Sequence, residues 1–137
     1  MAKISVACIA IDDNEQVLVA HRNPVGQMGG RWEFPGGKVE ENERDVDAVI
    51  REFREEFGVT VKVGSRIAVS TFEHNGETVQ LHAYRVFVPH KGKIFKYRLT
   101  EHSEYRWIHI DEVKSLNFVD SDLNIYPEVK KYVLFKG

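Results

Sequence analysis

Three glutamates, Glu52, Glu55 and Glu56, stand close together in a chain of 137 residues. If their segment is helical, spacings of three and four residues make them neighbours on one helix surface. Carboxylate oxygens are ligands that Mg²⁺ and Mn²⁺ prefer, and Mg²⁺ usually binds carboxylates together with substrate phosphates. The spacing alone does not establish a metal site. A solvent-exposed helix face whose glutamates pair with Arg51 and Arg54 is the more common explanation of such an acidic segment.

The segment 44–57 around these glutamates has the clearest helical pattern in the chain. Its apolar residues at helical spacing are Val46, Val49, Ile50, Phe53 and Phe57. They predict an apolar stripe that packs on the rest of the protein, with the glutamates at its edge, where a cleft could form. Gly58 follows directly and is a natural end for the helix, because glycine readily adopts the left-handed conformation.

Residues upstream of the helix favour the metal hypothesis. Gly36 and Gly37 come first, and glycine lets the backbone approach a ligand closely and present its carbonyl oxygen. Glu43 lies eight residues before Arg51, which is about two helical turns. The two side chains can therefore pair and hold the incoming loop against the helix.

The complete pattern resembles the Nudix box. The fixed positions of that motif are filled by Gly37, Glu43, Arg51-Glu52, Phe53, Glu55-Glu56 and Gly58-Val59. The resemblance implies a metal site formed by the side chains of Glu52, Glu55 and Glu56 and the backbone carbonyl of Gly36. The motif departs from its common form at Asn42 and Arg44, where Gly and Thr are usual, so we expect a changed loop and an intact metal site.

The box also implies roles for residues that do not touch the metal. Glu43 and Arg51 would form a structural pair, and we also predict a catalytic role for Arg51. Gly37 would permit a tight loop, and Gly58 would end the helix. The cofactor implied is Mg²⁺, with Mn²⁺ as a substitute. Metal ions would clamp the phosphate oxygens and lower the pKa of a bound water.

A second segment is similar to the MutT-like branch of the family. Leu99, Glu101, His102 and Trp107 match the pattern L-x-E-H-x-x-x-x-W. In that branch the glutamate completes the metal site from a loop, which makes Glu101 a further predicted ligand. Glu101 and Glu52 are the two candidates for the general base that takes a proton from water.

Several substrate-binding residues follow from the same resemblance. The sequence WEFPGGK at 32–38 is similar to a MutT-type segment and predicts contacts from Phe34, Gly37 and Lys38. Arg22 matches a position that contacts the nucleotide. His82 lies inside a predicted strand and is a further candidate for lining the nucleotide cleft.

Asp122 falls where an Asn or Asp reads the base in similar enzymes. Here the flanking prolines of the family pattern are missing. An ionised Asp only accepts hydrogen bonds, which suits the amino group of cytosine or the N–H groups of guanine. Donation to a guanine carbonyl needs Asn or a protonated Asp, so the choice between oxidised guanine and cytosine stays open. The alternative is that Asp122 caps the last helix.

The remaining elements must position these residues. Strands are predicted at 4–11, 16–22, 31–34, 59–73, 77–89 and 105–110, a helical turn at 111–115, and a closing helix at 123–134. Pro35-Gly36-Gly37 is expected to stop the third strand, Asn75-Gly76 predicts a hairpin, and Pro127 is expected in the first turn of the closing helix. The pattern predicts an α/β fold with a mixed sheet between helices. The resemblance implies a Nudix-type α/β/α sandwich with a central and a C-terminal helix.

Bulk properties bound the protein class. The length suits a single domain, residues 1–137, without repeats or linkers. The net charge of −2 argues against nucleic-acid and membrane partners. The lone Cys8 and the short apolar N-terminal run, which lacks a signal-peptide pattern, predict a cytoplasmic protein. A monomer and a homodimer are both compatible with the sequence.

These patterns predict a Mg²⁺-dependent nucleoside triphosphate pyrophosphohydrolase with a small-molecule nucleotide as its partner. It would convert a (d)NTP and water into a (d)NMP and pyrophosphate. Its expected purpose is to remove a modified nucleotide from the pool, a DNA-repair role. One alternative is a nucleotide-sugar or ADP-ribose hydrolase of the same family. Another is a Nudix-fold sensor that binds a nucleotide without turnover.

Overall fold

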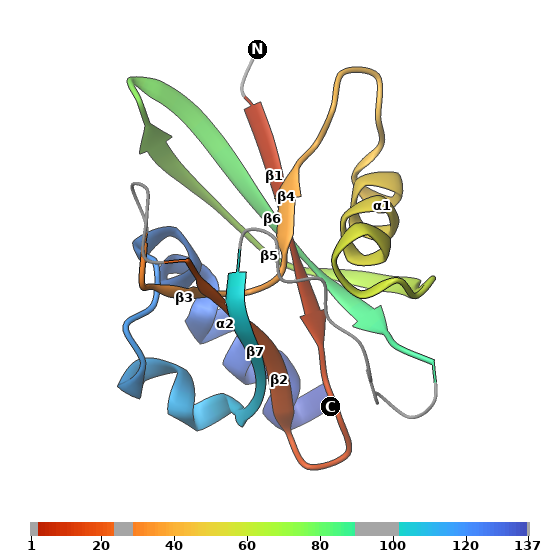
Figure 1. The fold of residues 1–137 in the computed structure, drawn as a ribbon, viewed down its shortest axis with the longest axis vertical. Helices are drawn as coiled ribbons and strands as arrows, with labels where there is room; N and C mark the ends of the chain where they lie inside the picture. The colour runs from red at the N-terminus through yellow and green to blue at the C-terminus, as the bar shows by residue number, and fades with distance from the viewer. Residues whose placement is uncertain (1–2, 24–28, 90–101, 137) are drawn as a thin grey trace.

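Two β-sheets and two α-helices make up the part of the chain that the computed structural model describes, residues 3–23, 29–89 and 102–136 (Figure 1). The elements are β1 (Lys3–Ala10), β2 (Gln16–Arg22), β3 (Trp32–Glu33), β4 (Gly36–Lys38), α1 (Asp45–Phe57), β5 (Lys62–His74), β6 (Glu77–Phe87), β7 (His102–His109), the 3-10 helix η1 (Ile110–Ser115) and α2 (Asp120–Lys136). The first sheet has the order β4-β1-β6-β5, and the second has the order β3-β2-β7.

The first sheet is mixed because of β1. This strand pairs antiparallel with β4 and parallel with β6, and β6 pairs antiparallel with β5. The β5–β6 hairpin turns at Asn75-Gly76, where φ is 52° and 77°. A two-residue turn of this kind needs positive φ at both positions, which Asn and Gly tolerate best. The predicted mixed sheet and hairpin are confirmed.

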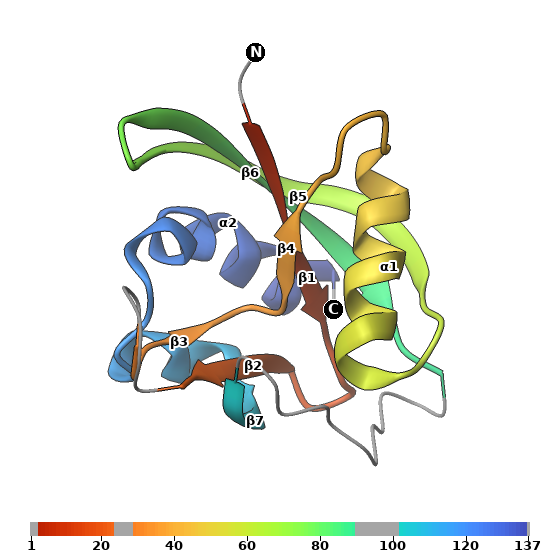
Figure 2. The ribbon, with the colours of Figure 1, turned by 45° about the horizontal axis from the view of Figure 1, so that its top comes forward.

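Alternate residues of β1 pack on opposite faces of this sheet. Val6, Cys8 and Ala10 belong to one buried cluster with residues of α1, and Ala7 and Ile9 belong to another with residues of α2. This follows from the two-residue period of a strand. The helices α1 and α2 accordingly lie on opposite sides of β1 (Figure 2), as the predicted fold class requires.

The helix α1 begins and ends close to where its sequence predicts. Its first flanking residue, Arg44, makes no side-chain capping bond. At the other end Gly58 has a left-handed φ of 71°, and its N–H donates to the carbonyl of Arg54 at 2.8 Å. The apolar stripe packs as predicted at Val49, Phe53 and Phe57. Val46 differs, because its position on the first turn leaves it 38% exposed.

The strand β4 was not expected, because Pro35-Gly36-Gly37 was predicted only to stop the preceding strand. The chain does break after Glu33, but it resumes pairing at Gly36, and Ser5, Val6 and Ala7 of β1 lie opposite Lys38, Gly37 and Gly36. Gly36 has a φ of 154°, and a Cβ there would lie 2.0 Å from the carbonyl oxygen of Val6. The pairing therefore depends on the absence of a side chain.

The helix α2 begins earlier than predicted, at Asp120. Asp120 and Asp122 lie in its first turn, where the helix dipole favours negative charge. Pro127 is consequently inside the helix rather than in its first turn. Asp122 lies within the helix, so the predicted alternative that it caps the helix is wrong. None of the helices in the described ranges is long and apolar enough to cross a lipid bilayer.

Candidate active site

The three glutamates of α1 differ in burial and in their partners. The side chains of Glu52 and Glu56 are 17% and 14% exposed, whereas that of Glu55 is 57% exposed. Burial raises the pKa of Glu52; Arg51 opposes this shift, and the charges of Glu55 and Glu56 add to it. Within the described ranges, no three acidic, histidine or cysteine side chains already surround one point. Glu52 and Glu55 pair with Arg51, and Glu56 pairs with Tyr105.

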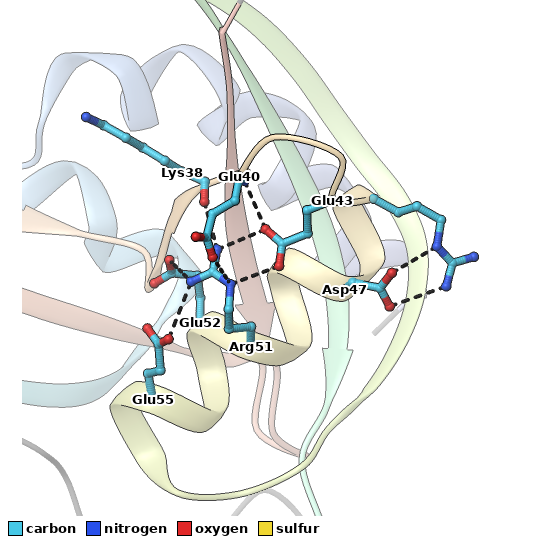
Figure 3. A network of polar contacts seen from close by, with 8 residues as sticks. Lys38, Glu40, Glu43, Asp47, Arg51, Glu52 and Glu55 are labelled. Carbon is cyan, nitrogen blue, oxygen red and sulfur yellow. Dashed lines mark hydrogen bonds and ion pairs between the residues drawn. The ribbon is translucent and has the colours of Figure 1, made fainter.

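Arg51 binds several partners and thereby holds the loop before α1 against the helix (Figure 3). Its guanidinium donates to both carboxylate oxygens of Glu43, at 2.8 Å and 3.0 Å. It also donates to Glu52 at 2.9 Å and to the carbonyl of Lys38 at 2.9 Å. The hydrogen bond from Arg51 lowers the pKa of Glu43. These fixed donors keep the acidic residues near one another.

Gly37 forms a cradle for the carboxylate of Glu52. A Cβ placed on Gly37 would lie 2.5 Å to 2.6 Å from the carboxylate atoms of Glu52. Only a residue without a side chain leaves this space, so the glycine explains how Glu52 reaches the backbone of β4. The carboxylate is thereby placed beside the strand that carries the carbonyl of Gly36.

Glu56 belongs to a second polar network, which starts at β7. The hydroxyl of Tyr105 donates to Glu56, and the Nδ1 of His102 lies 3.2 Å from the same hydroxyl. The Nε2 of His102 donates to Glu33 at 2.8 Å. Burial opposes the charge on His102, but the carboxylates of Glu33 and Glu56 outweigh it and raise the pKa of His102 to about 9. Both ring nitrogens can therefore donate at neutral pH.

Asp122 is buried beside the backbone of residue 34. Its side chain accepts a hydrogen bond from the N–H of Phe34 at 2.8 Å, and the residue is 6% exposed. Burial raises the pKa of Asp122 to about 8; the charge of Glu33 adds to this, and the Phe34 N–H opposes it. The carboxyl group is therefore mostly protonated at neutral pH. The ring of Phe34 is buried against Phe118, so its contact with Asp122 is through the backbone.

The other predicted substrate-binding residues lie in different surroundings. Arg22 donates to Glu33 at 3.0 Å, which places it beside the network of His102. Lys38 contributes its backbone carbonyl to Arg51, while its side chain points away from that guanidinium (Figure 3). His82 lies on the α1 face of β6, with its ring nitrogens 2.5 Å from Asp45 and 2.9 Å from Gln80. Its predicted role in nucleotide binding stays a prediction.

Glu101, the predicted metal ligand and alternative general base, lies outside the described residues. Its neighbour His102 is the first residue of β7 and is buried. The role of Glu101 therefore stays a prediction.

Similarity to a known protein family identifies the family of this chain. A family model described as NUDIX domain matches residues 1–129. The chain belongs to the Nudix family. Its relatives place it in the MutT-like branch.

Three similar proteins show how much sequence identity and chain length these matches share. A CTP pyrophosphohydrolase of Escherichia coli K12 is 38% identical over 63% of this chain and 64% of its own length. The match thus spans less than two thirds of that relative. An 8-oxo-dGTP diphosphatase of Buchnera aphidicola is 31% identical over 77% of this chain and 76% of its own length. The solution structure of the E. coli ORF135 protein superimposes with a TM-score of 0.81 at 30% identity, and the match covers 96% of this chain and 90% of that one.

Nudix proteins typically require a divalent metal, and the residues present here fit one. The donor set consists of carboxylate and carbonyl oxygens, the chemistry that Mg²⁺ and Mn²⁺ favour. The space that a Cβ at Gly37 would fill holds the Glu52 carboxylate instead. We expect Glu52, Glu55 and Glu56, with the carbonyl of Gly36, to hold the ion.

Sequence reasoning missed two residues of this Nudix site, Glu33 and Tyr105. Glu33 accepts from Arg22 and His102, and Tyr105 donates to Glu56. Both lie in strands, where the predicted pattern marks only which face is buried. No local signal in the sequence shows that residues 33 and 102 meet.

A methyl group at Gly37 tests the cradle. In Gly37→Ala the new Cβ would overlap the Glu52 carboxylate, so that side chain must move. We expect Mn²⁺ affinity to fall by about 10- to 100-fold, the usual effect of disturbing the support of a metal ligand. Thermal unfolding should change little, because the displaced group is the end of a flexible side chain. Electron paramagnetic resonance titration with Mn²⁺ measures the affinity, and unchanged binding would contradict the cradle.

Proposed function

We propose that this Nudix chain is a divalent-metal-dependent nucleoside triphosphate pyrophosphohydrolase. It would release a nucleoside monophosphate and pyrophosphate. The observation that carries the proposal is the acidic face of α1, which Arg51 and the Gly37 cradle hold beside β4. When bound, the ions would supply positive charge to the triphosphate and acidify the attacking water.

The pKa shifts of two glutamates suggest different roles for them. Burial raises the pKa of Glu52. Burial also acts on Glu56, but hydrogen bonds from His102 and Tyr105 outweigh it and lower the pKa of that carboxyl. A carboxylate with a raised pKa is the better proton acceptor, and one with a lowered pKa stays ionised as a ligand. We therefore propose Glu52 as the general base and Glu56 as a ligand, with Glu101, which lies outside the described residues, as the alternative base.

The carboxyl group of Asp122 favours a substrate base that presents a hydrogen-bond donor next to an acceptor. A protonated carboxyl donates through one oxygen and accepts through the other. It can therefore pair with the amino group and ring nitrogen of cytosine, or with the carbonyl and N1–H of a guanine. Adenine and thymine also present such an adjacent pair, so the choice among bases rests on the relatives. The two relatives described above act on CTP and 8-oxo-dGTP. We propose a cytosine or oxidised guanine nucleotide as substrate, and removal of a modified nucleotide as the purpose.

A panel of nucleotides with Mg²⁺ tests this function. The panel contains 8-oxo-dGTP, dGTP, CTP, dCTP, dTTP, ADP-ribose and a UDP-sugar. We expect pyrophosphate release from a cytosine or an 8-oxoguanine triphosphate at a rate well above that from dTTP. Cleavage of ADP-ribose or the UDP-sugar alone would indicate the alternative hydrolase class. Tight binding without any product would indicate a sensor, and either result would refute the proposal.

The raised pKa of Asp122 also predicts how stability changes with pH. The pKa of about 8 in the folded state is above the ordinary value of about 3.9. Folding therefore favours the protonated form, and this stabilisation is complete below about pH 3.9 and lost as pH rises through 8. Asp122→Asn cannot ionise and should lose less stability between about pH 6 and pH 9.

Urea unfolding at the two pH values measures this difference. Asp120→Asn is the matched control, because Asp120 lies in the same helical turn and its side chain is 84% exposed. The control should follow the wild type. Equal pH dependence of the wild type and Asp122→Asn would show that Asp122 is ionised when the protein is folded at neutral pH.

A further inference from the structure

His102 lies between Glu33 and the proposed metal ligand Glu56. It is the first residue of β7 and lies opposite Arg22 of β2. Its side chain is 6% exposed. A histidine so deeply buried has one stable orientation, which its hydrogen-bond partners fix.

One side of His102 faces the proposed base-binding residues. Its Nε2 donates to Oε2 of Glu33 at 2.8 Å, and the same oxygen accepts from Arg22 at 3.0 Å. Glu33 is followed directly by Phe34, whose N–H donates to Asp122. The position of Glu33 therefore affects the backbone that holds Asp122.

The other side of His102 faces a proposed metal ligand. Its Nδ1 lies 3.2 Å from the hydroxyl of Tyr105, which donates to Glu56, and 3.6 Å from the Glu56 carboxylate itself. The side chains of Glu33 and Glu56 are only 20% and 14% exposed. Without His102, two mostly buried carboxylates would lose a shared donor, and each would be held by one remaining partner, Arg22 for Glu33 and Tyr105 for Glu56.

We propose that His102 is a positioning residue. Its single imidazole ring orients Glu56 as a ligand for the metal and orients Glu33 next to the backbone that binds Asp122. The proposal rests on the proposed metal site of α1. It goes beyond that site because His102 itself neither binds the ion nor touches the reacting atoms. A group that orients a metal ligand commonly contributes about 10- to 100-fold in metal affinity or activity.

The test uses the full chain with His102→Ala, the conservative His102→Gln, and His74→Ala as a matched control. His74 lies at the tip of the β5–β6 hairpin and contacts Asn75. Electron paramagnetic resonance titration with Mn²⁺ alone gives metal affinity without turnover. We expect about 10- to 100-fold weaker Mn²⁺ binding in His102→Ala, partial recovery in His102→Gln, and no change in His74→Ala. Circular dichroism and thermal unfolding verify that each variant is folded.

Steady-state kinetics with CTP and 8-oxo-dGTP provide the second readout. In His102→Ala, kcat should fall by about 10- to 100-fold and KM should change less, because the ligand for the metal is disturbed more than substrate contacts. A folded His102→Ala with wild-type Mn²⁺ affinity overturns the proposal. If the wild type binds Mn²⁺ but cleaves no nucleotide, the proposed function fails, and the Mn²⁺ titration still decides the role of His102.

Tyr105→Phe keeps the proposal testable if His102→Ala does not fold. This variant removes only the hydroxyl between His102 and Glu56, and its ring can keep the edge-to-face contact with Phe57 at 4.8 Å. Weaker Mn²⁺ binding in folded Tyr105→Phe supports the link to Glu56. Wild-type Mn²⁺ affinity in that variant overturns it.

Discussion

Replacing Glu56 by glutamine is expected to lower kcat by at least about 100-fold, because even residues that only orient a metal ligand contribute 10- to 100-fold. Glutamine keeps the size of the side chain and can still accept the hydrogen bond from Tyr105. It lacks the negative charge that a divalent ion requires. The loss should therefore appear in turnover and Mn²⁺ affinity, and thermal stability should fall to a smaller extent because the charged pair of Glu56 with His102 is lost.

Pyrophosphate release at saturating Mg²⁺ measures the loss in Glu56→Gln. Glu112→Gln is the control, because Glu112 is exposed in η1, away from α1, and makes the same chemical change. The control should retain wild-type activity. Full turnover in Glu56→Gln would mean that this carboxylate does not hold the metal.

The helix of the site was predictable because its signals are local. The apolar stripe of α1, its end at Gly58 and the spacing of its glutamates all occur within 15 residues of chain. The pairing of Glu43 with Arg51, predicted from their separation of eight residues, is present at 2.8 Å, although Glu43 lies in the loop before the helix. Such features depend on neighbours in sequence, so the sequence contains most of the information that determines them.

Other features depend on contacts between distant segments. The strand β4 has two glycines and hence no alternating side chains, and its pairing with β1 joins residues about 30 positions apart. Asp122 looks like a helix cap in the sequence, but it lies inside α2 and accepts from the N–H of Phe34, which is 88 residues away. His102 and Glu33 are separated by 69 residues. Periodicity cannot reveal these contacts, because it shows the face of a residue and not its partner.

Replacing Arg51 by glutamine should destabilise the protein by about 2 to 3 kcal/mol at pH 7, the usual value for hydrogen bonds to charged groups. Arg51 neutralises several carboxylates at once, including Glu43 and Glu52, whose side chains are 15% and 17% exposed. The variant leaves these groups close together without a cation. Their repulsion adds to the lost hydrogen bonds, so few other substitutions at this site should cost as much stability.

The destabilisation of Arg51→Gln should depend on pH with a definite sign. The hydrogen bond from Arg51 lowers the pKa of Glu43 below its ordinary value of about 4.3. A lowered pKa contributes stability above the unfolded value, and this contribution is lost as pH falls through the folded value. The difference between the variant and the wild type should therefore be largest near neutral pH and should shrink below about pH 4.

Urea unfolding at pH 7 and at about pH 3.5 separates charge pairing from packing. Arg54→Gln is the matched control, since Arg54 is exposed on the same helix and the hydrogen bond of its backbone carbonyl with Gly58 does not involve its side chain. The control should change stability by less than about 0.5 kcal/mol. A loss in Arg51→Gln that is equally large at both pH values would assign it to the alkyl chain of Arg51 rather than to its charge. Loss confined to neutral pH would instead show that the charge of Arg51 stabilises the protein by pairing with the carboxylates around it.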